Sequence, residues 1–88
     1  MRYRIAFTDR AARELESLPR HVQKRIARWL DLLSADPRRE GTKKLEGPSD
    51  LRRVHASKDY VIVYAVRDEE VLVLIVRVAH RKEAYRGL

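Results

Sequence analysis

The sequence contains no cysteine among its 88 residues. Disulfide bonds, thiolate metal sites and thiol nucleophiles are therefore excluded, and a reducing compartment is expected. No apolar run approaches the roughly 20 residues that a membrane-spanning helix needs. The opening MRYRIAFTDR has charge on both sides of a short apolar alternation, unlike the continuous apolar segment of a signal peptide. We therefore expect a cytoplasmic protein without membrane contact.

Acidic residues are scarce relative to basic ones. The 20 Lys and Arg against 13 Asp and Glu give a formal net charge of +7. A solvated surface is one explanation, but clustering of the cations favours a polyanionic partner, either nucleic acid or an acidic protein. Seven Lys or Arg against three acids lie between residues 37 and 58, and four against one lie between residues 77 and 86. This clustering favours the polyanionic partner.

Several catalytic motifs are also missing. The sequence has no Gly-rich phosphate loop, no His-Glu-x-x-His helix and no paired carboxylates in an apolar setting. Ser57, Asp59 and His80 could form a hydrolase triad on paper, but their spacing does not support one. We expect neither a metal nor a cofactor.

The apolar periodicity predicts two helices and four strands. Thr8 is placed to cap a helix that begins at Asp9 and ends near Pro19, and a second helix is expected over residues 20–35. A loop follows from Pro37 to Pro48, where two Gly and two Pro occur. The expected strands cover residues 3–7, 51–56, 60–67 and 71–78.

This order predicts a single α+β domain over residues 1–88. An N-terminal strand and a helical hairpin precede a three-stranded antiparallel meander, and all strands form one sheet with the helices on one face. The run VLVLIVRV is apolar at consecutive positions, which indicates an interior strand. Trp29 is expected to anchor the core rather than to stack on a base. The other face of the sheet is left for a ligand.

Among possible reactions, RNA cleavage by attack of the neighbouring 2′-hydroxyl requires the fewest catalytic groups beyond those present in this sequence. The reaction needs a proton acceptor, cations that stabilise the phosphorane and a proton donor for the leaving 5′-oxygen. His55 and His80 can carry protons near neutral pH, and Arg side chains can bind phosphate oxygens. Tyr85 can stack on a base or donate a hydrogen bond. His21, on the basic second helix, is interpreted as a surface residue.

Three segments carry a resemblance to a known family: KLEG, DYVIVYAV and the ending RVAHRKEAYR. With the small basic format and the order of elements, they resemble the RelE-type toxins of bacterial and archaeal toxin–antitoxin systems. The resemblance implies a microbial ribonuclease-like fold and a metal-independent endoribonuclease, an mRNA interferase that cuts mRNA in the ribosomal A site and inhibits translation. The implied partners are the ribosome, mRNA and a cognate acidic antitoxin, with operator DNA contacted only through the antitoxin.

The resemblance also suggests roles for individual residues. Arg81 matches the arginine after the last strand, and Tyr85 matches the tyrosine of the C-terminal segment. The basic pair of the second strand corresponds to Arg53 and His55 if Val54 points into the core, or to Arg52 in a gapless alignment. We therefore take the catalytic candidates to be Arg53, His55, His80, Arg81 and Tyr85. Candidates for RNA binding are Lys43, Lys44, Arg52, Lys58, Arg77, Lys82 and Arg86.

Val61 departs from the family pattern, which commonly has an arginine after the tyrosine at the start of the third strand. Either Lys58, Arg52 or Arg53 compensates for the missing cation, or activity is reduced. Two alternatives to the ribonuclease stay open: a ParE-like toxin that inhibits DNA gyrase, and a catalytically weak module that binds antitoxin or nucleic acid.

Overall fold

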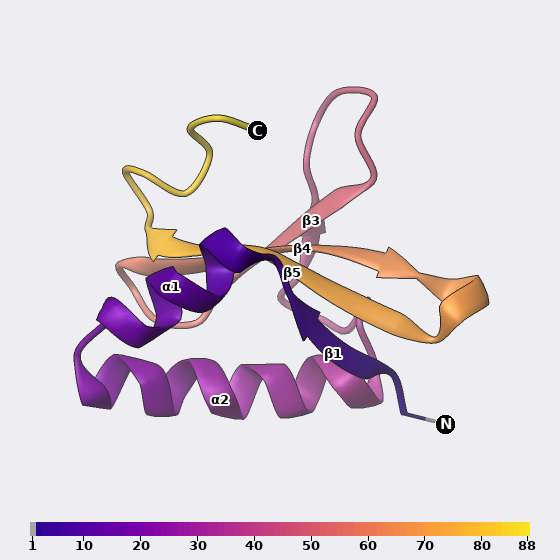
Figure 1. The fold of residues 1–88 in the computed structure, drawn as a ribbon. Helices are drawn as coiled ribbons and strands as arrows, with labels where there is room; N and C mark the ends of the chain where they lie inside the picture. The colour runs from indigo at the N-terminus through magenta and orange to yellow at the C-terminus, as the bar shows by residue number, and fades with distance from the viewer. Residues whose placement is uncertain (1) are drawn as a thin grey trace.

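The computed structural model describes residues 2–88, which form one layer of helices against one sheet (Figure 1). Both helices lie on the same side of the sheet, as predicted from the sequence. The elements are, in chain order, β1 (Arg4–Phe7), α1 (Asp9–Ser17), α2 (Arg20–Ala35), β2 (Lys43–Lys44), β3 (Leu51–His55), β4 (Tyr60–Arg67), the 3-10 turn η1 (Asp68–Glu70) and β5 (Leu72–His80).

The sheet has the strand order β1-β5-β4-β3-β2. β1 pairs with β5 in parallel, while β3, β4 and β5 form the expected antiparallel meander. β5 lies between β1 and β4, which confirms that it is an interior strand. The two-residue strand β2 was not expected. It lies within the segment predicted to be a loop, and it brings the sheet to five strands by pairing antiparallel with β3.

The helix boundaries follow from local chemistry. The Thr8 hydroxyl accepts a hydrogen bond from the Ala11 amide at 3.1 Å, so it caps α1 as predicted. Leu18 is extended and Pro19 directly precedes α2, so the two helices join through a tight bend. At the other end of α2, Asp36 is extended because Pro37 follows it.

Apolar side chains are buried on both faces of β4. On the helical side, Ile62 and Tyr64 pack with Val54 and with Ile26 of α2. On the other side, Val61 and Val63 pack with Ala79 and with Ala84. The segment after β5, residues 81–88, is called the tail here. Because the tail covers part of the face that we expected to be free, only the remaining part of that face is open to a ligand.

Helix α1 closes an edge of the sheet that β1 leaves uncovered. β1 ends where Phe7 pairs with Ile75, so the next residues of β5 have a strand on the β4 side only. The Thr8 hydroxyl donates to the Val76 carbonyl at 3.2 Å, and a Glu14 carboxylate oxygen accepts from the Val78 amide at 3.1 Å. These two side chains satisfy backbone groups that would otherwise form an exposed edge.

A surface cluster ties three distant segments together around Asp68. Its carboxylate accepts hydrogen bonds from the Tyr3 hydroxyl at 2.7 Å and from both terminal nitrogens of Arg38 at 3.1 and 2.8 Å. The hydrogen bonds from Arg38 and then from Tyr3 lower the pKa of Asp68 to about 2. The cluster thus joins the N-terminal strand and the loop after α2 to the turn between β4 and β5. Within residues 2–88, no helix is both long and apolar enough to cross a bilayer.

One buried hydrogen bond anchors the loop after α2 to the sheet, and it can be tested. The Tyr64 hydroxyl is fully buried and donates to the Pro37 carbonyl at 2.6 Å. The substitution Tyr64→Phe leaves that carbonyl without its donor, so we expect the free energy of unfolding to fall by about 1–3 kcal/mol. Urea unfolding measures the change, and Tyr85→Phe, at an exposed hydroxyl, is the control. An unchanged midpoint for Tyr64→Phe would show that water replaces the bond.

Candidate functional site

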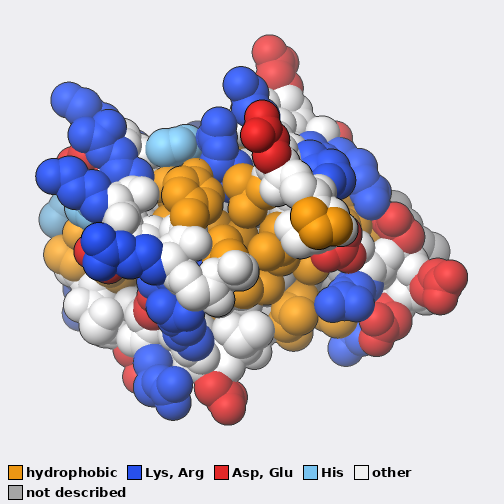
Figure 2. All heavy atoms as spheres, turned by 90° about the horizontal axis from the view of Figure 1, so that it is seen from above, with side chains coloured by type: hydrophobic (Ala, Val, Ile, Leu, Met, Phe, Trp, Pro, Cys, Tyr) orange, Lys and Arg blue, Asp and Glu red, His pale blue; other side chains and the backbone are white. Residues whose placement is uncertain are grey.

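The sheet face opposite the helices, called the open face, carries cations above an apolar floor. Lys43 pairs with Arg53, and Arg53 pairs with Val63 on the next strand. His55 pairs with Val61. Because directly paired residues share a face, Lys43, Arg53 and His55 stand on the same side as the buried valines. Figure 2 shows this face as an apolar hollow with Lys and Arg on both sides.

The orientation of Val54 decides which basic residues of β3 reach the open face. Val54 is 1% exposed and packs in the core on the helical side. Residues alternate along a strand, so Arg53 and His55 point to the open face and Arg52 does not. Arg52 instead donates to the Thr42 hydroxyl at 2.9 Å. Of the two alternatives from the sequence, the geometry therefore favours Arg53 with His55 over Arg52.

The tail forms the opposite side of the hollow. The Arg81 amide donates to the Asp59 carbonyl at 2.7 Å, and the Arg81 side chain, 50% exposed, lies 3.8 Å from the Asp59 carboxylate. This contact fixes Arg81 at the turn between β3 and β4, close to the end of β3 at which His55 stands. Tyr85 is also exposed, and Ala84 between them is fully buried.

Lys58, Lys82 and Arg86 are exposed, as an RNA contact requires. Lys58 lies in the same turn as Asp59, while the Arg86 guanidinium is 3.4 Å from the Glu83 carboxylate. The Lys44 side chain, in contrast, is hydrogen-bonded within the protein. Its ammonium donates within its own loop to the carbonyls of Leu45, Gly47 and Ser49. Lys44 therefore organises the loop between β2 and β3.

His80 lies away from the open face. It pairs with Tyr60, whose ring packs on the helical-side core, and the two rings meet edge to face with centroids 5.7 Å apart. The His80 Nδ1 accepts from the Lys82 amide at 3.2 Å, so the neutral ring carries its proton on Nε2. His80 was a catalytic candidate, but alternation along β5 turns its ring to the helical side, away from Arg53 and His55.

Arg77 was a candidate for RNA binding, but the structure places it in the interior. The residue is 4% exposed, and its guanidinium forms a buried ion pair with Glu14 of α1, with Nη2 2.6 Å from a carboxylate oxygen. The Nη1 atom donates to the carbonyls of Glu83 at 3.0 Å and Arg86 at 2.9 Å. Each nitrogen of the guanidinium donates to a protein acceptor, and the contacts of Nη1 hold the tail.

An apolar pocket of about 450 Å³ lies between the loop before β3 and the tail. Leu45 and Leu51 line one side, and Tyr85 and Leu88 line the other. Sequence reasoning missed Leu45, Leu51 and Leu88 as site residues. The sequence did contain a signal for them. Each is an isolated apolar residue in an otherwise charged segment, and such residues are often buried against another part of the chain.

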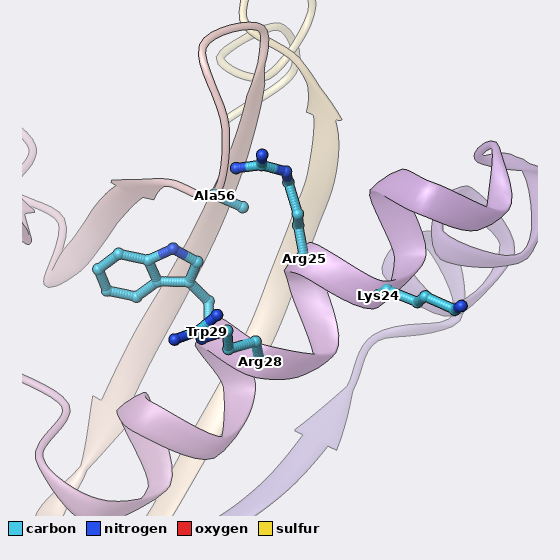
Figure 3. Close-up of a pocket in the computed structure, with 5 residues that line it drawn as sticks. All are labelled: Lys24, Arg25, Arg28, Trp29 and Ala56. Atoms are coloured by element: carbon cyan, nitrogen blue, oxygen red, sulfur yellow. The ribbon is translucent and has the colours of Figure 1, made fainter.

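Trp29 packs against the helical-side core, as predicted, but it is only partly buried. It lines a second pocket of about 410 Å³ with Lys24, Arg25, Arg28 and Ala56. Figure 3 shows that Arg25 extends toward Ala56, while Lys24 points away from the indole. The Arg39 guanidinium lies 5.7 Å from the centre of the Trp29 ring. No group of three or more His, Asp or Glu among residues 2–88 is arranged to bind a metal ion.

Residues 5–85 match the family model described as ParE toxin of type II toxin–antitoxin system. The chain belongs to the RelE/ParE toxin family. It is 33% identical over 90 residues to the toxin RelG of Mycobacterium tuberculosis, which covers 98% of this chain and 99% of that protein. This confirms the resemblance to RelE-type toxins inferred from the three sequence segments.

Solved structures of RelE toxins share the fold. The isolated RelE toxin of E. coli superposes with a TM-score of 0.80 at 30% identity, covering 94% of this chain and 88% of that chain. The RelE–RelB complex of Pyrococcus horikoshii gives 0.78 at 30% identity, covering 96% of this chain and 100% of that chain. The protein is thus a toxin of a type II toxin–antitoxin system.

Val61 provides a test of how tightly this toxin packs its open face. The residue is 0% exposed beneath the tail and contacts the cluster that includes Ala84. In Val61→Arg, the longer side chain must displace Ala84, so we expect the free energy of unfolding to fall by about 1–3 kcal/mol from overpacking. Urea unfolding measures this, with the apolar change Val61→Ile, which adds only one methylene group, as the matched control. If Val61→Arg and the parent had equal free energies of unfolding, the tail would be able to move away from residue 61 without loss of stability.

Proposed function

We propose that this toxin is a ribosome-dependent endoribonuclease that cleaves mRNA in the ribosomal A site by 2′-hydroxyl attack on the phosphodiester, without a metal ion. The observation that carries the proposal is that two segments, β3 and the tail, place polar side chains around the same apolar surface of the open face. Arg53 and His55 come from β3, while Arg81 and Tyr85 come from the tail. The relatives that are at least 30% identical and carry the name RelE support the same reaction class.

The chemistry assigns each group a role. A base removes the 2′-hydroxyl proton, the 2′-oxygen attacks phosphorus, and the bond from phosphorus to the 5′-oxygen breaks to leave a 2′,3′-cyclic phosphate. His55 is the histidine of the open face and is our candidate for the proton transfers. Arg53 and Arg81 would stabilise the extra negative charge of the phosphorane through charge-assisted hydrogen bonds. These cations supply the positive charge that a metal would provide in other nucleases.

Val61 shifts the phosphate-binding role to the residues beside the floor. The family arginine at this position would rise from β4 next to His55, whereas Val61 provides only an apolar surface. Arg52 is turned to the helical side and held by Thr42, so it does not compensate. Arg53, on the strand next to Val61 and on the same face, is the better candidate, with Lys58 at the adjacent turn.

The apolar pocket would accept an unpaired base. Tyr85 is 42% exposed at its edge, and aromatic side chains stack on bases that are splayed out of a helix. A codon exposed in the ribosomal A site is single-stranded, and the net charge of +7 favours approach to ribosomal RNA. Lys43, Lys58, Lys82 and Arg86 would hold the backbone on either side.

We also propose that a cognate acidic antitoxin binds this toxin. The basic surface is complementary to an acidic chain, and the related toxin of Pyrococcus horikoshii forms a complex with RelB. Any operator DNA would be contacted through the antitoxin.

The cleavage proposal is tested in a translation extract with a defined mRNA whose new 5′ ends are mapped. We expect cuts at codon positions that require ribosomes. Arg81→Ala should slow cleavage about 10²–10³-fold, because it removes one charge-stabilising donor. Tyr85→Phe keeps the ring and should slow cleavage less. A single 2′-deoxynucleotide at the cut site should block the reaction, since the attacking hydroxyl is then missing.

The matched control is Arg28→Ala, which removes an exposed arginine on α2, in the layer behind the sheet. It should cleave like the parent protein. Intact mRNA together with blocked DNA supercoiling by gyrase would refute the ribonuclease and support the gyrase inhibitor. Intact mRNA with unaffected supercoiling would refute both activities and support the third alternative, a module that binds antitoxin or nucleic acid.

Salt dependence gives a separate test of the backbone contacts. Lys43→Gln and Arg53→Gln each remove one cation from the open face. For binding to a single-stranded RNA with 2′-O-methyl riboses, which cannot be cleaved, we expect each change to reduce the slope of log affinity against log salt by about 0.7. Arg28→Gln, with the same loss of charge on α2, is the control. A slope unchanged in the open-face variants would mean that RNA does not lie there.

A further inference from the structure

The guanidinium of Arg77 holds two different parts of the toxin with its two sides. Its Nε and Nη2 atoms donate to the Glu14 carboxylate, with Nε 2.9 Å and Nη2 2.6 Å from Oε2. Its Nη1 atom donates to the Glu83 and Arg86 carbonyls at 3.0 and 2.9 Å. One buried side chain on β5 therefore links helix α1 to the backbone of the tail.

The tail has few other contacts that fix its position. Ala84 is its single fully buried residue, and it packs on Val61, Val63 and Ala79. The Arg81 amide is held at the start of the tail by the Asp59 carbonyl. Local backbone hydrogen bonds, from the Glu83 and Ala84 amides to the His80 carbonyl and from the Arg86 amide to the Glu83 carbonyl, shape the tail as a turn. The residues from 85 to 88 are exposed. The Nη1 donations of Arg77 therefore supply the polar anchor in the part of the tail that contains Tyr85.

The path of the tail after Arg86 agrees with this anchoring. Gly87 has φ = +75°, a left-handed conformation that glycine adopts without strain. A Cβ at this position would lie 3.2 Å from Nη1 of Arg10 on α1. The chain thus turns sharply directly after the carbonyl that Arg77 binds, and it turns beside the same helix that supplies Glu14.

We infer that Arg77, held by Glu14, is a positioning residue that fixes the tail so that Arg81 and Tyr85 face the substrate. Arg77 acts from beneath the surface, because its side chain is 5% exposed and each of its guanidinium nitrogens already donates to Glu14 or to the tail. This inference rests on the proposed ribonuclease function for its effect on catalysis, but the effect on the tail is independent of it. Glu14 has a second duty at the edge of β5, where it accepts from the Val78 amide.

The test compares amide hydrogen exchange in the parent, Arg77→Met and Arg77→Lys. Methionine fills similar volume but donates no hydrogen bond, while lysine keeps a cation near Glu14 without the planar fork that reaches both partners. We expect the amides of Ala84 and Arg86 to exchange about tenfold faster in both variants. The amides in the centre of β4 should keep their protection. Arg38→Met, which breaks the exposed pair with Asp68 at the other end of the sheet, is the control.

Cleavage by the same variants is measured in the translation extract. We expect kcat to fall in proportion to the fraction of molecules in which the tail is docked, with KM changed less, because Arg81 and Tyr85 are then in place for only part of the time. Unchanged tail exchange in Arg77→Lys would overturn the inference. If Arg77→Met loses protection throughout the sheet, Arg77→Lys alone decides the question. A parent protein without cleavage activity would refute the ribonuclease proposal and leave the exchange result standing.

Discussion

The buried ion pair between Arg77 and Glu14 is the constraint on which the arrangement of the open face depends. Charges removed from water are costly, and a buried pair is tolerated only when its remaining hydrogen-bonding groups are satisfied. Here the guanidinium donates to one carboxylate and two tail carbonyls, and Glu14 also accepts from the Val78 amide. The pair therefore couples the first helix, the interior strand β5 and the tail.

This coupling explains how a small basic domain can cover part of its open face and still leave a site there. Ala84 is small enough to lie on Val61 and Val63 without blocking the cations beside them. Arg53 and His55 stay accessible on β3, and Arg81 is held at the neighbouring turn by the Asp59 carbonyl. Positive charge thus surrounds an apolar floor. Such a surface offers phosphate contacts at its sides and a dry platform for a base.

Much of the fold could be predicted from periodicity and capping. Thr8 and Pro19 mark the two ends of the first helix. The Thr8 hydroxyl caps its first turn and Pro19 lacks the amide hydrogen that would continue it, and both effects depend only on neighbouring residues. The position of β5 inside the sheet followed from its consecutive apolar residues. In contrast, the two-residue strand β2 depends on pairing with β3, and no local pattern of Lys43 and Lys44 predicts that pairing.

The site was harder to predict, because side-chain direction and burial arise from tertiary contacts. Whether Arg52 or Arg53 reaches the open face depended on the direction of Val54, which the sequence left open. Arg77 looked like a surface cation because it precedes a basic segment. A signal was present, since an arginine within a strand buried on both faces requires an acidic partner. The sequence did not identify Glu14, 63 positions away, as that partner.

Val61 and Ala84 are best understood as a matched pair. A long cationic side chain at residue 61 would rise into the space that Ala84 occupies, so a tail packed this closely requires a short apolar residue beneath it. The buried Arg77 fixes the tail at that distance from the sheet. The short side chain at residue 61 and the docked tail are therefore consequences of the same packing, and the cations of the open face, Arg53 and Arg81, lie at the sides of the floor.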